Sequence, residues 1–472
     1  MVRAPVWNAS APKTVLVIAS RFPPVASVGA IRIRKFVKYL GEFGWKPIVI
    51  TGAAPQGGAD PDDTPRAADE SSLFDLPEGL PIHRLSHQVD EWPHHLSRSF
   101  GNRLASWTRW FGLDEERWKD GLCWRFERLH DRCSFPDRGS WRLLSAVRLG
   151  LRMHRRYRFD AIFSSGMPFS DHLIGLALRR LLRKPWLADF RDPWAEYIHW
   201  PQWRTGWGRR LTWFSEAAVV RSSSFVVSVN ESMTKRFASR YAKESADKFV
   251  TVANGFDPMD FNHFADDDSQ TDTASCFRLV YVGSLYETRS PENVLAAFRR
   301  FIQTVPGSRK HARFEFIGRA GEHLDKLTNP QDGDTVRYRG MLPYPLALDA
   351  LARADLNVVM LPNIRGSEND TTTKIYECLG SGRPILAAVP LQGAAARVLC
   401  PFDGVTLCDP DDVSGMSSAI TDHYRRWLAG TVLTSRSEGQ LAPLTRRQQT
   451  KELAAYLDSS ILSSRISGGL IQ

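Results

Sequence analysis

The sequence lacks the features of a secreted or membrane-spanning protein. Its six cysteines are scattered: they are Cys123, Cys133, Cys276, Cys378, Cys400 and Cys408. They form no CxxC pair and have no histidine at zinc spacing, so we expect reduced thiols rather than a disulfide framework. The apolar runs, such as 15–19 and 385–389, are far shorter than the roughly 20 residues that a membrane-spanning helix needs. Residues 1–13 contain no apolar core of a secretory signal. These absences predict a cytoplasmic protein without a zinc site.

The chain has 472 residues, more than one hydrophobic core usually supports, so two domains are expected. Hydrophobic residues make up 43% and charged residues 24% of the chain, which excludes a mostly disordered protein. The net charge is +10. A basic balance suits anionic partners such as phosphates, nucleic acids or acidic membrane surfaces, and charge alone does not choose among them.

The basic charge is concentrated in residues 94–156. This stretch has 14 Arg or Lys against 7 Asp or Glu, a net charge of +7, and five tryptophans interleaved with arginines. Aromatic rings and basic side chains together favour the headgroup boundary of an anionic membrane. We therefore expect peripheral, salt-sensitive membrane association through residues 94–130. The alternative is that these tryptophans pack into the core of the first domain.

The first half of the chain alternates strands with helical stretches. Residues 14–19 predict a buried strand, 31–43 a helix that ends at Gly44, and 47–51 a second strand, which together form a β-α-β unit of a parallel sheet. Further strands are expected at 161–164, 186–189, 225–229 and 249–252. Residues 53–79 are rich in Ala, Pro, Asp and Gly and predict a surface loop.

The alternation restarts in the second half. Strands are expected at 278–282, 313–317, 336–338, 356–360, 385–388 and 405–407, with helices between them. We therefore predict an α/β protein of two Rossmann-like doubly wound domains facing across a cleft, with ligands beyond the carboxyl ends of the strands. The predicted parts are a first domain at 1–253, a linker at 254–275, a second domain at 276–444, and a helical segment at 445–472 that returns to the first domain.

Two candidate sites lie in the first half. The turn after the first strand leads through Gly29 into a helix, and a helix start offers N–H groups to an anion. The alternative is an ordinary loop. A later strand ends by delivering Asp189, Arg191 and Asp192 at the carboxyl edge of the sheet, where sites form. The alternative is that Asp192 caps a helix that has Pro193 at its first position.

Two further candidate sites lie in the second half. Gly283 follows the first strand of that half and permits close backbone approach, and Arg289 can pair with phosphate through its planar guanidinium. Further on, a hydroxyl-rich turn ending at Thr373 starts a helix whose free N–H groups and Lys374 can bind a phosphate. Glu377 lies three residues later on nearly the same face and can accept hydrogen bonds from a ribose diol. The alternatives are a solvated surface arginine and a buried structural glutamate.

Five segments together resemble glycosyltransferase family 4, which has the GT-B fold. They are the Pro23-Pro24 turn, 189–194, 254–257, 283–291 and 374–384. The resemblance implies a nucleotide diphosphate sugar bound mainly by the second domain, metal-free transfer of a hexosyl or N-acetylhexosaminyl group with retention of configuration, and no cofactor. Many members glycosylate lipid-linked acceptors at the cytoplasmic membrane face. The expected acceptor is therefore a saccharide, such as a lipid-linked one in cell-surface polysaccharide synthesis.

The resemblance also implies roles for individual residues. The predicted donor-binding residues are Gly29, Gly283, Arg289, Thr373, Lys374 and Glu377, and the predicted catalytic residues are Asp192, Arg191 and Asp189. Glu377 matches the family's ribose-binding glutamate, and Lys374 and Arg289 fall in its phosphate-binding region. Asp192 is expected to orient the acceptor or to stabilise the positive sugar of the transition state.

The chain departs from the family in three places. The family's E-x7-E motif places an acid where this chain has Asn369, with Glu368 one residue early, and Arg191 replaces the usual histidine. Ser290 stands where many members have lysine, which leaves more of the diphosphate charge to Arg289. These departures raise the alternative of a catalytically inactive nucleotide-sugar-binding protein. A nucleic-acid-binding protein would not explain two α/β domains with phosphate-type turns, so no nucleic acid is expected.

Overall fold

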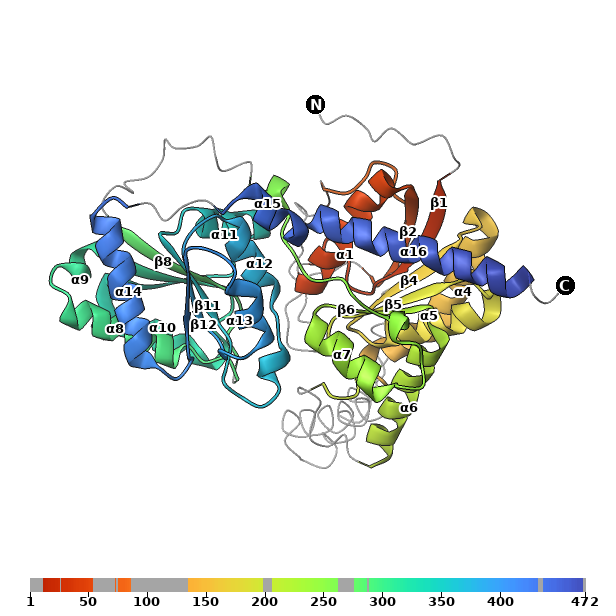
Figure 1. Cartoon of the computed structure of the whole chain (residues 1–472), viewed down its shortest axis with the longest axis horizontal. Helices are drawn as coiled ribbons and strands as arrows, with labels where there is room; N and C mark the ends of the chain where they lie inside the picture. The colour runs from red at the N-terminus through yellow and green to blue at the C-terminus, as the bar shows by residue number, and fades with distance from the viewer. Residues whose placement is uncertain are drawn as a thin grey trace, which may run out of the picture. The chain divides into compact units, whose positions relative to one another are not determined.

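The computed structural model describes residues 12–25, 27–53, 73, 75–85, 135–197, 206–261, 276–286, 288–431 and 436–469. The chain divides into two compact α/β units, residues 1–252 together with 450–472, and residues 253–449 (Figure 1). Each unit has its own parallel sheet with helices on both faces, which confirms the predicted α/β class with two doubly wound sheets. Among the described residues, no helix is long and apolar enough to cross a membrane.

The first unit contains a seven-stranded sheet in its described part, with the order β3-β2-β1-β4-β5-β6-β7. The strands are β1 (Lys13–Ile18), β2 (Trp45–Thr51), β3 (Ile82–Arg84), β4 (Ala161–Gly166), β5 (Trp186–Phe190), β6 (Phe225–Ser228) and β7 (Phe249–Thr251). β1 pairs in parallel with both β2 and β4. The strand order reverses there, and in open α/β sheets such a switch point is where ligands bind. All of these strands except the three-residue β3 were predicted.

Four helices cover one face of this first sheet. They are α4 (Leu143–Tyr157), α5 (Ser170–Leu182), α6 (Trp207–Ser222) and α7 (Glu231–Arg240). Their buried residues, among them Ala146, Leu178, Val219 and Phe237, share a core with the sheet. A short 3-10 helix, η3 (Arg138–Arg142), leads into α4.

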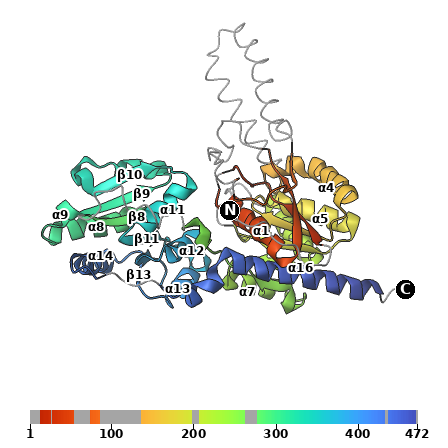
Figure 2. The ribbon, with the colours of Figure 1, turned by 90° about the horizontal axis from the view of Figure 1, so that it is seen from above.

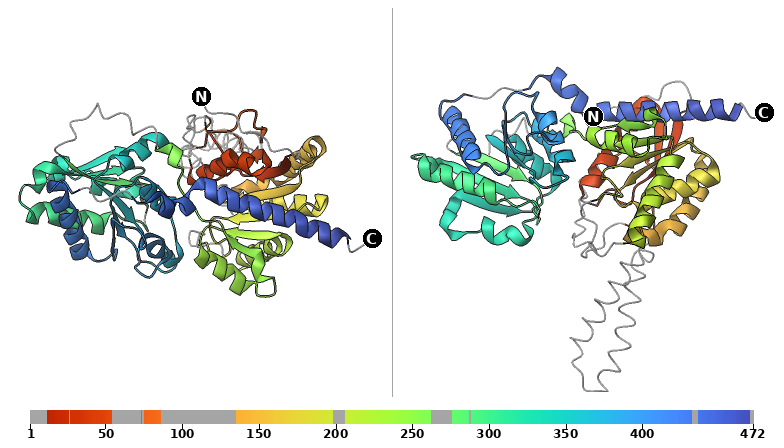
Figure 3. Two further views of the ribbon diagram at one scale, coloured as in Figure 1. Left: turned by 45° about the horizontal axis from the view of Figure 1, so that its top comes forward. Right: turned by 60° about the horizontal axis from the view of Figure 1, so that its bottom comes forward.

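The other face is covered by α1 (Val28–Leu40) and by the end of the chain. In α1, the buried residues Ile33, Phe36, Val37 and Leu40 recur at helical spacing. A 3-10 turn (Gly41–Phe43) follows and ends at Gly44, whose φ of 78° lies in the left-handed region that glycine tolerates. α16 (Arg446–Gly469) lies beside α1 and buries Leu453 and Leu457 in the same core (Figure 3).

The second unit contains a six-stranded sheet in its described part, with the order β10-β9-β8-β11-β12-β13. The strands are β8 (Phe277–Val282), β9 (Ala312–Ile317), β10 (Val336–Gly340), β11 (Leu356–Met360), β12 (Ile385–Ala388) and β13 (Val405–Cys408), all at predicted places. Here β8 pairs in parallel with both β9 and β11. The switch point of this sheet therefore lies at the carboxyl ends of β8 and β11.

Helices again cover both faces of the second sheet (Figure 2). α8 (Glu292–Thr304) and α14 (Val413–Leu428) pack on one face. α11 (Tyr344–Ala352), α12 (Thr373–Gly380) and α13 (Ala394–Leu399) pack on the other. The remaining short helices of this unit include η5 (Pro258–Asp260), α9 (Ser308–His311), α10 (Leu324–Leu327), η9 (Ser367–Asn369) and α15 (Glu438–Leu441).

The segment predicted as a linker is folded where it is described. Residues 253–261 belong to the second unit, and Phe256 is buried in the core of that unit. The backbone of Phe256 exchanges hydrogen bonds with Leu444 and Arg446, and Gln449 donates to the carbonyl of Asn254 at 2.6 Å. Because residues 254–275 are mostly polar, the sequence did not indicate that Phe256 is part of the hydrophobic core. Residues 262–275, the segment 94–130 and nearly all of the predicted loop at 53–79 lie outside the described residues.

Candidate active site

The switch point of the second sheet brings the start of α12 next to the end of β8. Thr372 is the N-cap of α12, yet its side chain makes no capping hydrogen bond and its buried hydroxyl oxygen has no partner. Thr373 follows as the first helical residue and is buried. A helix start whose cap hydroxyl is unused presents both that hydroxyl and the free N–H groups of the first turn to an incoming anion.

Lys374 extends from this helix start to Gly283, which directly follows β8. A β-carbon at Gly283 would collide with the lysine ammonium group, so glycine is what leaves room for it. The Lys374 nitrogen lies 5.2 Å from the ring centroid of Tyr281, at the edge of a cation–π contact. Burial, reinforced by the positive charge of Arg289, lowers the pKa of Lys374 to about 7. The charge of Glu377 opposes this shift but does not outweigh it, so the positive charge of Lys374 is only partly compensated.

Arg289 is the second cation of this site. Its guanidinium carbon lies 4.9 Å from the ring centroid of Tyr286, and its buried Nε has no hydrogen-bond partner. A tight turn holds the residue, because its backbone N–H donates to the carbonyl of Tyr286 at 2.6 Å. Within the described residues, neither Arg289 nor Lys374 forms an ion pair with a carboxylate. Because a buried donor without a partner is costly, these groups are suited to bind an anion.

Glu377 lies on the same helix and is also buried. The hydroxyl of Tyr344 in α11 donates to one of its carboxylate oxygens at 3.1 Å. Burial raises the pKa of Glu377, while the Tyr344 bond and the charge of Arg446 act in the opposite direction. Glu377 therefore has a protein partner that the sequence did not indicate. One of its two oxygens is engaged, and Oε2 has no hydrogen bond from another described residue.

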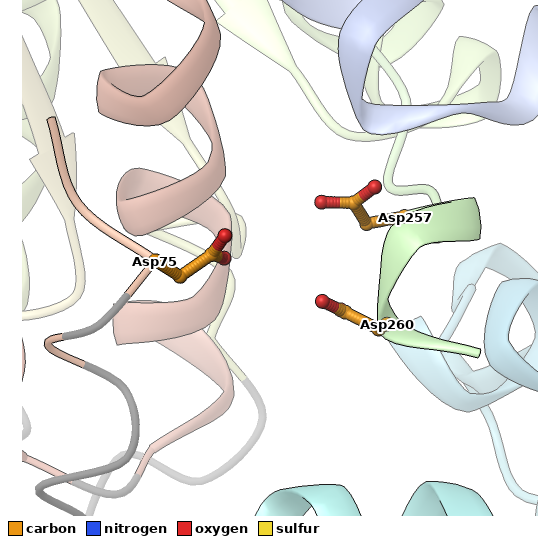
Figure 4. A group of neighbouring side chains, drawn as sticks. All are labelled: Asp75, Asp257 and Asp260. Atoms are coloured by element: carbon orange, nitrogen blue, oxygen red, sulfur yellow. The ribbon is translucent and has the colours of Figure 1, made fainter. Parts of the chain in front are cut away.

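Three aspartates lie outside the two sheets, one in the first unit and two near the start of the second. Asp257 and Asp260 project from η5 in the second unit, and Asp75 lies beside α1 in the first (Figure 4). Asp260 is 3.5 Å from the hydroxyl of Tyr344. Asp75 is paired with two lysines of α1, Lys35 and Lys38, each at 2.5 Å. The carboxylate of Asp257 accepts a hydrogen bond from the N–H of Met259 at 3.1 Å, so each of the three carboxylates has a neighbour within its own unit.

In the first unit, the turn after β1 is held by α5. The backbone N–H of Ser20 donates to Asp171 at 2.7 Å, and its hydroxyl donates to the other carboxylate oxygen. Burial raises the pKa of Asp171 to about 6, although the charge of Arg142 opposes this shift. Sequence reasoning missed Asp171, because an acid in the first turn of a helix usually indicates only a favourable helix dipole.

The structure brings Gly29 and Arg191 together. A β-carbon at Gly29 would collide with the guanidinium of Arg191, which lies against the first turn of α1. Arg191 donates to the carbonyl of Gly166 at 2.7 Å and to that of Met167. These contacts place Arg191 at the switch point of the first sheet and give Gly29 a second reason to be glycine besides the predicted approach of a donor phosphate.

Asp189 is completely buried and forms a network with α1. It accepts two hydrogen bonds from Arg32, at 2.8 and 3.1 Å, and one from Ser165 at 2.7 Å. Arg32 in turn donates to the carbonyl of Val252 at 2.8 Å. Burial alone would raise the pKa of Asp189, but the charge and hydrogen bonds of Arg32 outweigh it and hold the pKa below its usual range. This geometry favours a structural role for Asp189, whereas Arg191 and Asp192 reach beyond the sheet.

Asp192 begins an irregular segment rather than a helix. Residues 191–197 form bends and turns, and the next described helix is α6, so the alternative that Asp192 caps a helix at Pro193 is wrong. Trp194 holds this segment in place: its side chain is buried and stacks on Phe169, with 5.1 Å between the ring centroids. The N–H of Ala195 donates to the buried carboxylate of Glu216 at 2.7 Å. Asp192 itself is half-buried beside Arg191.

A buried histidine also lies next to this switch point. The Nδ1 atom of His172 is 2.9 Å from the hydroxyl of Ser164, which also accepts a hydrogen bond from the Trp186 indole. Burial lowers the pKa of His172 to about 3, so the ring is neutral at physiological pH. Its Nε2 has no hydrogen-bond partner. No spacing pattern in the sequence distinguishes this histidine from an ordinary helix residue.

Glu368 lies one residue before the position of the first acid in the family's E-x7-E motif, and its carboxylate contacts the backbone of its own loop. Glu368 is exposed in η9 and accepts a hydrogen bond from the N–H of Gly366 at 2.6 Å. The amide of Asn369 is 3.4 Å from the other carboxylate oxygen. The structure thus gives Glu368 a local partner.

Comparisons with known proteins agree with the fold of the two units. Residues 29–255 match the family model described as a glycosyl transferase 4-like domain. No curated protein matches the sequence significantly. Several solved structures share the fold over most of the chain, and three of them are described below. Their sequence identities to this chain are low, so they are evidence for a common fold and not for a common function.

The first of these is Anabaena HepE (Alr3699) in complex with UDP and glucose, with 12% identity, a TM-score of 0.59, and coverage of 95% of this chain and 100% of that one. Sucrose-phosphate synthase from Thermosynechococcus elongatus has 15% identity and a TM-score of 0.53, with coverage of 97% of this chain and 99% of that one. The lipopolysaccharide outer core galactosyltransferase WaaB has 10% identity and a TM-score of 0.52, with coverage of 94% of this chain and 99% of that one.

The two doubly wound units share the GT-B fold of these structures, and the matched domain supports a glycosyltransferase. Residues 29–255 are similar to a glycosyl transferase 4-like domain, which agrees with the resemblance to glycosyltransferase family 4 that the sequence predicts. This family evidence supports sugar transfer from a nucleotide sugar.

Proposed function

We propose that the second unit binds the diphosphate of a nucleotide sugar between Arg289, Lys374 and the start of α12. One observation carries this proposal: two cations without carboxylate partners in the described residues converge with an unused cap hydroxyl at the switch point of the sheet. An isolated buried cation is costly, so a bound anion would relieve the site and be held by charge-assisted hydrogen bonds. Glu377 would bind the ribose with the carboxylate oxygen that Tyr344 leaves available.

The same residues fit the chemistry of transfer. Breaking a sugar–phosphate bond develops negative charge on the departing diphosphate, and preorganised cations stabilise that charge in the transition state. We propose that Arg289 and Lys374 supply this stabilisation without a metal ion. Retention of configuration follows the family resemblance. Asp192 would orient the acceptor or stabilise the positive sugar, with Arg191 beside it.

We further propose a saccharide acceptor, lipid-linked and belonging to cell-surface polysaccharide synthesis. The resemblance to family 4 supports this acceptor class. Because the HepE structure contains UDP, UDP is the first nucleotide to test. A catalytically inactive nucleotide-sugar-binding protein would bind the same nucleotide but show neither transfer nor donor hydrolysis.

Calorimetric titration of the full chain with UDP, GDP and ADP tests the donor site. Lys374→Ala should weaken binding of the preferred nucleotide about ten- to a hundredfold, since one charge-assisted hydrogen bond is worth roughly 1.5–3 kcal/mol. Glu377→Ala should weaken it similarly. Lys310→Ala, which removes an exposed lysine of the same unit, is the matched control and should change nothing. Unchanged affinity in both site variants would contradict the proposal.

A further inference from the structure

The helices α4, α5 and α6 form one layer on the first sheet, with α5 between the other two (Figure 1). Their inward residues are buried in the core of that unit. We call the opposite, outward side of these three helices the α4–α6 surface. It combines two features that rarely occur together on a free protein surface: uncompensated positive charge and a row of large apolar side chains.

The positive charge comes from exposed arginines. On α4 and α5, and directly after α5, they are Arg148, Arg152, Arg155, Arg156, Arg180 and Arg183. α4 contains no acidic residue, and the single acid of α5, Asp171, is buried and bonded to Ser20. Within the described part of the chain, none of these arginines forms an ion pair. The surface therefore presents a positive field with no compensating charge of its own.

The apolar row lies on α6. Trp207, Leu211 and Phe214 are exposed to 82%, 46% and 71%, and their spacing places them on one face of the helix. Arg210 lies over the Trp207 ring at 5.6 Å, so charge and aromatic surface are directly adjacent. Leu144 on α4 and Leu181 on α5 are also about as exposed, at 60% and 61%. Apolar side chains clustered in this way indicate a surface that another phase or molecule covers.

We propose that the α4–α6 surface binds peripherally to an anionic lipid bilayer. The arginines would contact headgroup phosphates, and Trp207, Leu211 and Phe214 would enter the boundary between headgroups and acyl chains. A nucleic acid would satisfy the arginines but leave the apolar row in water. A second copy of this chain in a symmetric contact would bring the same arginines together, and that contact is repulsive. A bilayer satisfies both features.

This proposal does not depend on the donor site, because it concerns the first unit and needs no nucleotide. It is tested with the full chain by co-sedimentation with vesicles of phosphatidylcholine alone, or of phosphatidylcholine and phosphatidylglycerol in equal amounts. Binding should occur to the mixed vesicles, weaken with added salt, and be absent from the neutral ones.

Two variants separate the two features. In the first, Arg148→Gln, Arg152→Gln and Arg155→Gln together should weaken vesicle binding by about fivefold for each charge removed. In the second, Trp207→Ser, Leu211→Ser and Phe214→Ser together should weaken it at least about tenfold even at low salt. The matched control replaces three exposed cations of the second unit, Lys310→Gln, Arg337→Gln and Arg426→Gln, and should bind as the wild type does.

Several outcomes would overturn the proposal. Wild-type vesicle binding by the arginine variant would show that these arginines do not contact lipid, and an equal loss in the control would show that net charge alone acts. If the apolar variant binds vesicles normally and the protein binds duplex DNA as tightly, the surface is a polyanion site instead. If the apolar variant lowers the mass in solution by light scattering, the row is an interface between copies. Far-UV circular dichroism and melting temperature verify that each variant is folded.

Discussion

The ammonium group of Lys374 occupies the space that a side chain at Gly283 would need. The first residues of α12 and the end of β8 are therefore fitted to each other at the switch point of the second sheet. The two residues are far apart in the sequence, and their pairing follows from the parallel order that places β8 next to β11. It yields a test that alters the site without removing any charged group.

Gly283→Ala should displace the Lys374 ammonium and weaken nucleoside diphosphate binding about as much as Lys374→Ala, roughly ten- to a hundredfold. The Lys374 side chain can move aside, but the φ of 156° at Gly283 is one that residues with a side chain rarely adopt, so the variant should also lose some unfolding free energy. The two substitutions together should weaken binding little more than either alone, since they act through one contact. Gly439→Ala, which meets no neighbouring atom, is the control. Additive losses in the double variant would show that Gly283 acts independently of Lys374.

Nucleotide binding should depend on pH through Lys374. Its pKa of about 7 in the folded protein lies below the ordinary lysine value, so the ammonium form is present below that pH and is lost above it. Only the ammonium form attracts the diphosphate. Affinity should therefore fall between about pH 7.5 and 9.5, where the diphosphate itself no longer titrates, by up to about tenfold per pH unit.

Calorimetric titrations across that pH range provide the measurement. Lys374→Met should bind more weakly but with an affinity that no longer changes with pH. A wild-type profile that stays flat would mean that Lys374 does not contact the phosphates, or that it stays protonated throughout.

The second half of the chain illustrates what a sequence allows one to predict. The strands, the helix start at Thr373, and the candidates Gly283 and Lys374 could be placed, because a short-range pattern marks each of them. The hydrogen bond from Tyr344 to Glu377 could not be predicted. It joins α12 to α11, and nothing in the local sequence of either helix specifies that contact.

The first half shows the limit more clearly. Asp189 and Arg191 stand two residues apart at the end of one strand and look equivalent in the sequence. In the structure, Asp189 is buried against Arg32, whereas Arg191 lies against Gly29. Their difference arises from α1, which is contributed by a distant part of the chain. Side-chain alternation along β5 places both residues on the same face, so the alternation does not predict that their environments differ.

Asp189→Asn should act on stability. The substitution leaves the Arg32 guanidinium buried without its anion, which typically costs roughly 3–5 kcal/mol of unfolding free energy. Chemical denaturation of the full chain measures this loss. Nucleotide affinity should stay near that of the wild type, because the donor residues belong to the other unit. If stability is unchanged but transfer is abolished, Asp189 is a catalytic residue after all.

Asp192→Asn should act on turnover. Asp192 belongs to the first unit and reaches beyond the sheet, so its loss should lower kcat strongly while nucleotide affinity and melting temperature stay close to those of the wild type. Donor hydrolysis and transfer assays provide the turnover, and addition of EDTA should leave it intact. A variant that loses stability but retains kcat would make Asp192 a structural residue.

Glu216 should act through the segment that carries Asp192. Its buried carboxylate accepts hydrogen bonds from the N–H of Ala195, from Arg240 at 2.9 Å and from Tyr241 at 2.8 Å. Glu216→Gln retains a carbonyl oxygen for the Ala195 bond but loses the ion pair with Arg240. Glu216→Leu loses both. We expect both variants to lose roughly 1–3 kcal/mol of unfolding free energy.

The two variants should differ in kcat. With glutamine, residues 191–197 keep their backbone anchor and kcat should stay within a few-fold of the wild type. With leucine, the anchor is lost, Asp192 is no longer held in place, and kcat should fall about as far as in Asp192→Asn. Adding Asp192→Asn to the leucine variant should then cause little further loss, because both changes remove the same positioned carboxylate. Equal kcat values for the glutamine and leucine variants would show that the Ala195 bond stabilises the fold without positioning Asp192.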